Sequence, residues 1–342
     1  MANTESSTIC SSQFSRTDPV TVPGRTGPAG SCRSTAVIRL HSLGDVVLAQ
    51  PAAARLSEGG SLFLVTSREY APVAERMENV IPVMHDRETG LPGLRRLLRD
   101  MAPERIVDLQ NSMKTRLATL GMNVTGRFRM DRGLRKRVLR GDPATMPARR
   151  LDFLGAAGFT WGCEPSLVRS SPPPEDLAVG LGAGGRWRLK SIPSSVIAEA
   201  ARLLIDLYGA RVTITGGPGE EDLVTETSAS VMRDGVMTYC GEDGISGLIE
   251  VLEGLSLFVS PDSGPAHLAK ALGVPVMVVF TSTSPALGFW EQEGAGMYTS
   301  GRLDCRPCHR HGGEECSRGD EACRRGILPL DLVRNAMEMA VR

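Results

Sequence analysis

The chain has 342 residues with 39 basic and 39 acidic side chains, so its formal net charge is zero. This length predicts two domains, and the neutral balance excludes a molecule drawn as a whole to nucleic acid or to an anionic membrane. The sequence contains no run of about 20 apolar residues, which a membrane-spanning helix needs. We therefore expect a soluble protein in which any attraction to a charged partner is local.

The N-terminal segment is rich in Ser, Thr, Pro and Gly and lacks the apolar core of a signal peptide. We interpret residues 1–35 as a flexible lead-in. Eight cysteines in a chain that can build sizeable cores and has no export signal favour a reducing compartment over a disulfide framework. The predicted location is therefore the cytoplasm.

From residue 36, short apolar runs alternate with longer amphipathic ones, which predicts strands joined by crossover helices in a parallel sheet. In the first half the predicted strands are residues 36–40, 61–66, 80–84 and 105–109, and the predicted helices are residues 46–56, 69–77 and 94–101. Consecutive prolines at 172–174 favour an extended connector, so a domain boundary is expected there.

The alternation restarts after the prolines. The predicted strands are residues 177–181, 211–215, 236–239, 255–260 and 275–280, and the predicted helices are residues 194–208, 220–232, 246–252 and 265–272. The predicted domains are residues 36–170 and 171–328, the second with a cysteine-rich loop at 304–324. A terminal segment, 329–342, contains a helix expected to pack across both domains.

The strongest chemical signal is the turn Ser-Pro-Asp-Ser-Gly-Pro-Ala-His at 260–267, between a predicted strand and a predicted helix. Free N–H groups and the positive dipole end at a helix start bind anions, Ser263 can cap the helix, and Gly264 admits close approach. Asp262 would repel a phosphate, so it makes sense facing sugar hydroxyls. The residues alone leave open the alternative of simple helix capping with a packed or solvated His267.

Two further loops follow strands that end at the same edge of a parallel sheet, so they should lie near this turn. The first contains Gly217 and Glu220, whose carboxylate can hold ribose hydroxyls; an acidic residue favouring a helix start is the structural alternative. The second, at 182–190, contains Arg186 and ends in Lys190, and either cation can neutralise a diphosphate. It has neither a dinucleotide fingerprint nor a P-loop spacing.

In the first half, the strand at 36–40 leads into Leu43-Gly44-Asp45 and a helix. Asp45 therefore sits where a strand's carboxyl end meets a ligand crevice, a suitable place for a general base. A helix-capping aspartate is the alternative.

Residues 126–150 contain nine Lys or Arg against two Asp. A solvated charged face explains many such runs, but this excess can also meet a phosphorylated or membrane-embedded acceptor, at about 1 kcal/mol per cation near an anionic surface. The acceptor-binding candidates are Arg127, Arg135, Lys136 and Arg137.

Four cysteines, Cys305, Cys308, Cys316 and Cys323, give the spacing C-x2-C-x7-C-x6-C. The spacing is tight enough for a structural zinc site with four thiolates, although it is not a standard one. Two disulfides, or four thiols in a loop, are the alternatives.

Together these segments resemble the bacterial heptosyltransferases of glycosyltransferase family 9, which build the inner core of lipopolysaccharide. The likeness covers about residues 36–341. Its most specific parts are Leu43-Gly44-Asp45, Thr215-Gly216-Gly217-Pro218-Gly219-Glu220, Pro261-Asp262-Ser263-Gly264-Pro265-Ala266-His267-Leu268 and Ala271-Leu272-Gly273-Val274-Pro275. Residues 107–112 and 280–285 also match family elements, and the cysteine loop looks like one found in many members.

The resemblance implies an α/β protein with the GT-B fold, in which two doubly wound Rossmann-like domains face each other across a cleft. It implies inverting transfer of a heptose from ADP-heptose to a lipid A or inner-core acceptor at the inner face of the cytoplasmic membrane. The family roles fall on Asp45 as base, Lys190 on the diphosphate, Glu220 on the ribose, and Asp262 to His267, including Ser263 and Gly264, around sugar and phosphates.

No two aspartates stand two residues apart, so the metal-chelating Asp-x-Asp of another transferase fold is missing. We expect no cofactor in catalysis, with fixed cations and a helix dipole in place of a metal, and no nucleic-acid partner. One alternative is an enzyme of the same fold that transfers or epimerises a different nucleotide sugar. The other is a non-catalytic relative that binds a nucleotide sugar, which would not need Asp45.

Overall fold

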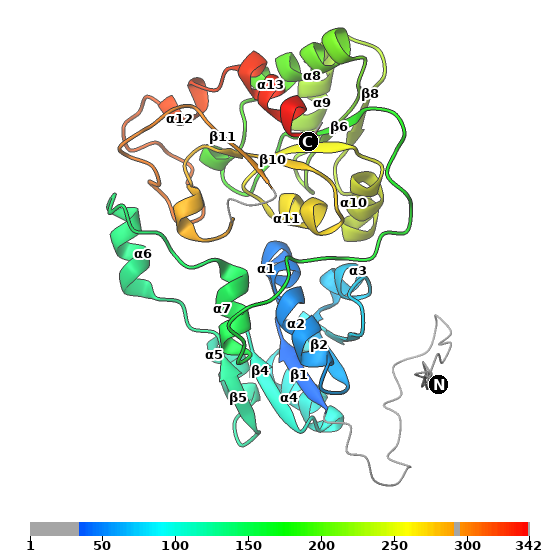
Figure 1. The fold of residues 1–342 in the computed structure, drawn as a ribbon, viewed down its shortest axis with the longest axis vertical. Helices are drawn as coiled ribbons and strands as arrows, with labels where there is room; N and C mark the ends of the chain where they lie inside the picture. The colour runs from blue at the N-terminus through cyan, green and yellow to red at the C-terminus, as the bar shows by residue number, and fades with distance from the viewer. Residues whose placement is uncertain (1–33, 291–294, 341–342) are drawn as a thin grey trace, which may run out of the picture. The chain divides into compact units, whose positions relative to one another are not determined.

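The computed structural model describes residues 34–290 and 295–340, and residues Cys32–Arg342 form one compact unit. Most of the lead-in predicted at residues 1–35 lies outside the described residues, and its last residue, Thr35, begins strand β1 (Thr35–Ile38). The compact unit contains two parallel sheets, one in each half of the chain (Figure 1). None of the described helices is long and apolar enough to cross a membrane.

The first sheet has five parallel strands in the order β3-β2-β1-β4-β5. The other four strands are β2 (Leu62–Ser67), β3 (Ile81–His85), β4 (Arg105–Asp108) and β5 (Val124–Arg127). Side chains alternate between the two faces of each strand. Val37 and Val107 therefore pack into one buried cluster and Ile38 and Ile106 into another, as a sheet covered on both faces requires.

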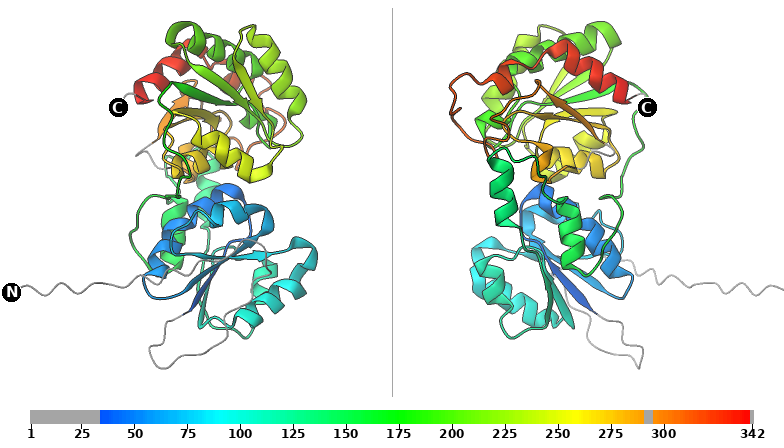
Figure 2. Two further views of the ribbon diagram at one scale, coloured as in Figure 1. Left: turned by 90° about the vertical axis from the view of Figure 1, so that its right-hand side faces the viewer. Right: turned by 60° about the vertical axis from the view of Figure 1, so that its left-hand side comes forward.

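Helices cover both faces of this sheet (Figure 2). Buried residues of α1 (Leu43–Leu48), α2 (Gln50–Ser57), α3 (Ala71–Ala74) and α7 (Arg149–Ala156) join one cluster, and those of α4 (Gly90–Met101) and α5 (Met113–Ala118) join the other. The helix predicted at 46–56 is in fact two helices, because α1 ends at Leu48 and Pro51 takes the first turn of α2. Short elements complete this half: η1 (Arg68–Tyr70), η2 (Arg87–Thr89) and α6 (Arg132–Leu139).

The second sheet has six parallel strands in the order β11-β10-β9-β6-β7-β8. They are β6 (Ala178–Gly182), β7 (Arg211–Thr215), β8 (Val236–Tyr239), β9 (Leu257–Pro261), β10 (Val276–Phe280) and β11 (Gly296–Thr299). Helices α8 (Ser194–Tyr208), α9 (Glu221–Val231) and α13 (Pro329–Ala340) lie on one face, and α10 (Gly244–Glu253) and α11 (Gly264–Ala271) on the other (Figures 1 and 2). Short helices η3 (Arg188–Lys190), η4 (Pro285–Leu287) and α12 (Ala322–Arg325) lie in the connections.

The terminal helix α13 lies on the second sheet. From the sequence, this helix was expected to pack across both domains. Its buried residues Leu332, Val333 and Ala336 share a core cluster with α8, and it contacts β9, β10 and β11. The buried residues of α13 thus pack against α8 and the second sheet.

Candidate active site

The two halves meet where the first turns of α1 and α11 touch, and two glycines make this approach possible. A Cβ on Gly44 would lie 2.8 Å from Cδ2 of His267, and one on Gly264 would lie 3.0 Å from the Cβ of Leu43. Both separations are too short for any larger residue without a shift. Gly264 was expected to admit close approach, and in the structure its close neighbour is Leu43. This contact brings Asp45 to the start of α11.

Asp45 is held on one side and free on the other. Its Oδ2 pairs with Arg39, and the hydroxyl of Ser42 donates to the same oxygen at 3.4 Å. Oδ1 is buried and has no hydrogen-bond partner. Buried polar atoms are almost always paired, so an orphaned carboxylate oxygen indicates a place for a hydroxyl or N–H of a bound molecule. Asp45 does not cap α1, which removes the alternative the sequence left open.

Asp262 is the centre of a buried polar network at the end of β9. Its Oδ1 accepts from Trp290 Nε1 at 2.7 Å, and its Oδ2 accepts from Thr283 Oγ1 at 3.0 Å and lies 3.3 Å from Lys190 Nζ. Burial acts to raise the pKa of Asp262, but the charges of Lys190 and His267 and these hydrogen bonds outweigh it and hold the pKa below its ordinary value. Asp262 is thus an ionised anchor for Lys190 and Trp290.

His267 lies one turn into α11, with its ring stacked on Trp290 at a centroid distance of 4.0 Å and an interplanar angle of 10°. Burial lowers its pKa to about 4, although Asp262 and Asp45 act in the opposite direction. The imidazole is therefore neutral near pH 7. The cap of α11 differs from the sequence argument: Ser263 makes no capping bond, because its hydroxyl bonds to that of Ser260 at 3.0 Å.

Lys190 ends η3, and its backbone is fixed by the cysteine-rich loop. Leu189 N–H donates to the carbonyl of Gly313 at 2.8 Å, and the Thr281 hydroxyl donates to the carbonyl of Leu189 at 2.7 Å. His311 of the same loop lies 6.0 Å from the ring of Phe289. The loop therefore supports the cation that faces Asp262.

Glu220 links two glycine loops. Its Oε1 accepts the N–H of Gly185 at 2.7 Å and its Oε2 the N–H of Gly217 at 2.6 Å. Neither bond was evident from the sequence, which suggested ribose binding or a favourable charge at a helix start. A carboxylate offers about four acceptor sites, so two remain for a ligand.

The four acceptor-binding candidates do not form one surface. Arg127 is committed to the fold, because it pairs with the buried Asp108 at 2.5 Å and donates to Thr119. Arg137 pairs with Asp142 at 2.8 Å, and Lys136 is exposed on α6. Arg135 differs from these three. Burial, together with the charges of Arg310 and Arg149, lowers its pKa, so it belongs to a group of neighbouring cations.

The cysteine loop does not support the zinc site that its spacing suggested. Across residues 34–290 and 295–340 no group of three or more His, Cys, Asp or Glu side chains is placed to hold a metal ion, and the four cysteines are free thiols. Individual thiols face separate partners: Cys308 Sγ lies 3.7 Å from the carbonyl of Ser282 and Cys316 Sγ 3.9 Å from Asp320 Oδ1. Burial raises the pKa of Cys308 to about 11.

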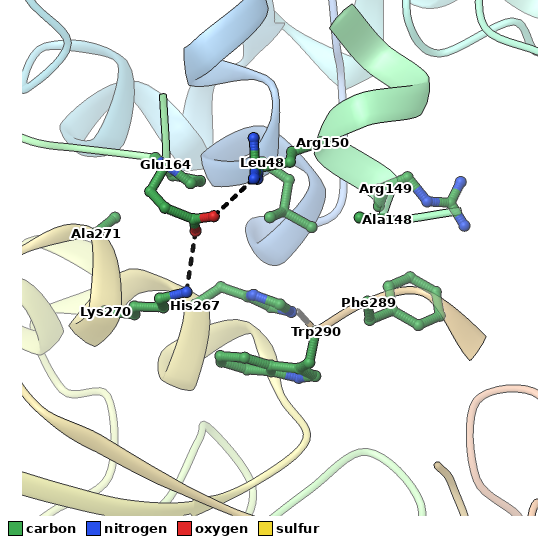
Figure 3. Close-up of a pocket in the computed structure, with 11 residues that line it drawn as sticks. Leu48, Ala148, Arg149, Arg150, Glu164, His267, Lys270, Ala271, Phe289 and Trp290 are labelled. Carbon is green, nitrogen blue, oxygen red and sulfur yellow. Dashed lines mark hydrogen bonds and ion pairs between the residues drawn. The ribbon is translucent and has the colours of Figure 1, made fainter. Parts of the chain in front are cut away.

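A small pocket lies beside this site, lined by residues of both halves (Figure 3). Glu164 stands between Arg150 and Lys270 at 2.9 Å from each and so ties the halves together. His267 and Trp290 form the opposite wall, and the side chain of Arg149 extends past Phe289, away from Glu164.

Solved structures share this architecture. The protein is similar to a family 9 glycosyl transferase from Veillonella parvula, with a TM-score of 0.73, 16% identity and coverage of 92% of this chain and 99% of that one. It is also similar to the E. coli ADP-heptose LPS heptosyltransferase II, with a TM-score of 0.70, 19% identity and coverage of 90% and 98%. Two doubly wound domains of this kind are the GT-B fold of glycosyltransferases, which confirms the predicted fold class.

The sequence comparisons point in the same direction. Residues 178–312, which contain Lys190, Glu220 and the Asp262 turn, match the model of glycosyltransferase family 9 (heptosyltransferase). The chain is 21% identical over 281 residues to the lipopolysaccharide core heptosyltransferase OpsX of Haemophilus influenzae, covering 74% of this chain and 80% of that protein. Residues 178–312 thus resemble glycosyltransferase family 9, and the chain is similar to a lipopolysaccharide core heptosyltransferase in sequence and to family 9 transferases in fold.

Proposed function

We propose that the protein transfers a heptose from ADP-heptose to a lipid A or inner-core acceptor of lipopolysaccharide, with inversion and without a metal. The observation that carries the proposal is the unpartnered, buried Oδ1 of Asp45 beside the start of α11. The names of the relatives support the donor and the acceptor, since one is an ADP-heptose LPS heptosyltransferase and another a lipopolysaccharide core heptosyltransferase.

In the proposed reaction, Asp45 Oδ1 takes the proton of an acceptor hydroxyl, and the hydroxyl oxygen forms a bond to the anomeric carbon from the face opposite the nucleotide. The bond from that carbon to the diphosphate breaks, and its electron pair leaves with the diphosphate. Lys190 and the free N–H groups at the start of α11 stabilise the departing charge. Neutral His267 contributes shape and hydrogen bonding rather than charge.

The remaining donor contacts follow from the same geometry. Glu220 has acceptor sites left for ribose hydroxyls, and Gly217 keeps that loop close to the nucleotide. Asp262 holds Lys190 in place and has acceptor capacity left for a sugar hydroxyl. Residues 171–328 would then bind the donor and residues 36–170 the acceptor at the inner face of the cytoplasmic membrane, with Arg135 and Lys136 near its phosphates.

A donor screen tests the proposal. Purified protein is incubated with deacylated lipopolysaccharide core and, separately, ADP-heptose and a panel of UDP- and GDP-sugars, and the released nucleotide and product mass are measured. We expect ADP release and a product heavier by one heptose. Turnover of another nucleotide sugar with no ADP release would contradict the heptose assignment, and donor binding without any transfer would indicate a non-catalytic relative.

A further inference from the structure

Arg149 is a buried cation that the proposed reaction does not use. It begins α7, it is 6% exposed, and its Nε is buried without a hydrogen-bond partner. Within the described part of the chain it forms no ion pair. The half-buried Asp152, one turn along the same helix, is the carboxylate whose pKa its charge affects, but the two do not come within ion-pair distance. A buried charge without a counterion is costly, so this arginine calls for an explanation.

Aromatic rings hold the guanidinium in place without neutralising it. Its Cζ lies 4.7 Å from the ring centre of Phe128, 5.0 Å from that of Phe289 and 6.0 Å from that of Phe153. Each cation–π contact contributes only about 0.5–2 kcal/mol. The rings come from both halves of the chain, and the Arg149 N–H also donates to the carbonyl of Gly288 at 2.8 Å. The cage thus fixes the side chain in the region where the halves meet.

Asp45 is close to this cage. Its partner Arg39 lies with Cζ 5.2 Å from the centre of the same Phe153 ring that Arg149 contacts. In Arg39 the positive charge is balanced by Asp45, whereas in Arg149 it is not. The group therefore carries a surplus of positive charge next to the proposed general base.

Two more cations face this region. Arg135 of α6 and Arg310 of the cysteine-rich loop are close enough to Arg149 or to one another to disfavour each other's charge. Arg310 and Lys190 likewise act with burial to lower the pKa of His311 to about 4. Cations from α6, α7 and the cysteine loop thus gather near Asp45, which is already paired with Arg39. A bound anion would relieve this repulsion.

We propose that Arg149 is the centre of an anion subsite that binds a carboxylate or phosphate of the acceptor, beside the hydroxyl that Asp45 deprotonates. The planar guanidinium matches either group with two parallel hydrogen bonds. The subsite makes the enzyme specific for acceptors that carry an anionic group close to the attacked hydroxyl. This inference rests on the proposed transfer and adds the acceptor class.

The test compares three acceptors in the unaltered protein and in its variants. The acceptors are deacylated lipopolysaccharide core, the same core after removal of phosphate, and the same core after reduction of its carboxylates to alcohols. The proteins are the unaltered chain and Arg149→Gln, with Arg149→Lys as the conservative variant. Arg150→Gln is the matched control, because Arg150 is the next residue of α7 and is already paired with Glu164 at 2.9 Å.

We expect Arg149→Gln to raise the KM for the intact core at least about tenfold, with a smaller change in kcat, and Arg149→Lys to recover part of the loss. Arg150→Gln should change this KM less than about threefold. In the unaltered protein, removal of the bound anionic group from the acceptor should raise KM by a similar factor. In Arg149→Gln, the same change to the acceptor should have no further effect on KM. The modified acceptor that shows this pattern identifies the bound group as a phosphate or a carboxylate.

An equal loss for every acceptor in both proteins would overturn the inference and leave Arg149 a structural residue. A variant that fails to fold is recognised by its thermal transition, and the acceptor comparison in the unaltered protein then decides. A loss of affinity with a modified acceptor supports the subsite and identifies the removed group as a bound anion. No loss of affinity with either modified acceptor overturns the subsite. Absence of any heptose transfer by the unaltered protein would instead contradict the proposed function.

Discussion

His267 should make the protein sensitive to acid. Its imidazole is 7% exposed and stacked on Trp290, and burial lowers its pKa from 6.5 to about 4. In the unfolded chain the pKa is near 6.5. Between these two values the unfolded state binds more protons than the folded state, so the free energy of unfolding falls as the pH decreases from about 6.5 towards 4.

The size of the effect follows from the two pKa values. One pKa unit corresponds to about 1.4 kcal/mol, so the full difference amounts to about 3 kcal/mol, of which about 2 kcal/mol is lost by pH 5. His311 has a pKa lowered to about 4 by burial and by Arg310 and Lys190, and it adds a loss of the same sign. The contribution of His267 must therefore be isolated by substitution.

Urea denaturation of the unaltered protein and of His267→Asn at pH 7.5 and pH 5 measures it. The variant loses stacking on Trp290 and should be less stable at pH 7.5, but its stability should fall by about 2 kcal/mol less between the two pH values. Equal decreases in the two proteins would refute the neutral, buried state of His267. Combining His267→Asn with His311→Asn should flatten the pH dependence further.

Three other substitutions test the packing and the polar network. Gly44→Ala should lower the free energy of unfolding by about 1–3 kcal/mol in urea denaturation and lower the transfer rate at least tenfold, because the new Cβ would lie 2.8 Å from His267. The control Gly155→Ala in α7, whose Cβ would have no atom within 4 Å, should be neutral or stabilising. Equal effects of the two substitutions would contradict the close contact at Gly44. Asp262→Asn keeps an acceptor for Trp290 but removes the counterion of Lys190, so kcat/KM should fall at least about tenfold in steady-state assays. An unchanged kcat/KM would show that Asp262 does not position Lys190. Glu220→Gln replaces one of the two accepting oxygens by an amide N–H donor. Calorimetry should therefore show weaker ADP binding, and urea denaturation should show a decrease of about 1–3 kcal/mol in the free energy of unfolding. An unchanged free energy of unfolding would refute the role of Glu220 as a link between the loops.

The sequence was enough to predict the strands that lead to the site, because each is a short apolar run with glycine or an acidic residue in the turn or helix start that follows. Strands β5 and β11 and helices α5, α6, α7 and α12 escaped prediction. Strand β5 has only four residues, of which just the first, Val124, is apolar, and the charged run that follows hides the apolar contacts of α6 with η4. Such elements depend on tertiary packing rather than on a local pattern.

The site residues divide in the same way. Asp262 follows β9 directly and Asp45 lies in the first turn of the helix after β1, so both could be located from the sequence. The side chains that bind the carboxylate of Asp262 could not be predicted in this way. Trp290 lies in a loop with no local signal. Arg39 did carry a signal, because a charged residue inside the apolar run at 36–40 must find a buried partner, and that partner is Asp45.

The central claim is that Asp45 is the base of a glycosyl transfer, and Asp45→Asn tests it most directly. The substitution keeps the size of the side chain and its contacts with Arg39 and Ser42 but removes most of its basicity. With ADP-heptose and deacylated core, kcat should fall by about 10²–10⁴-fold while the ADP affinity measured by calorimetry changes less than about threefold. Transfer within threefold of the unaltered protein, with the variant folded, would contradict the account.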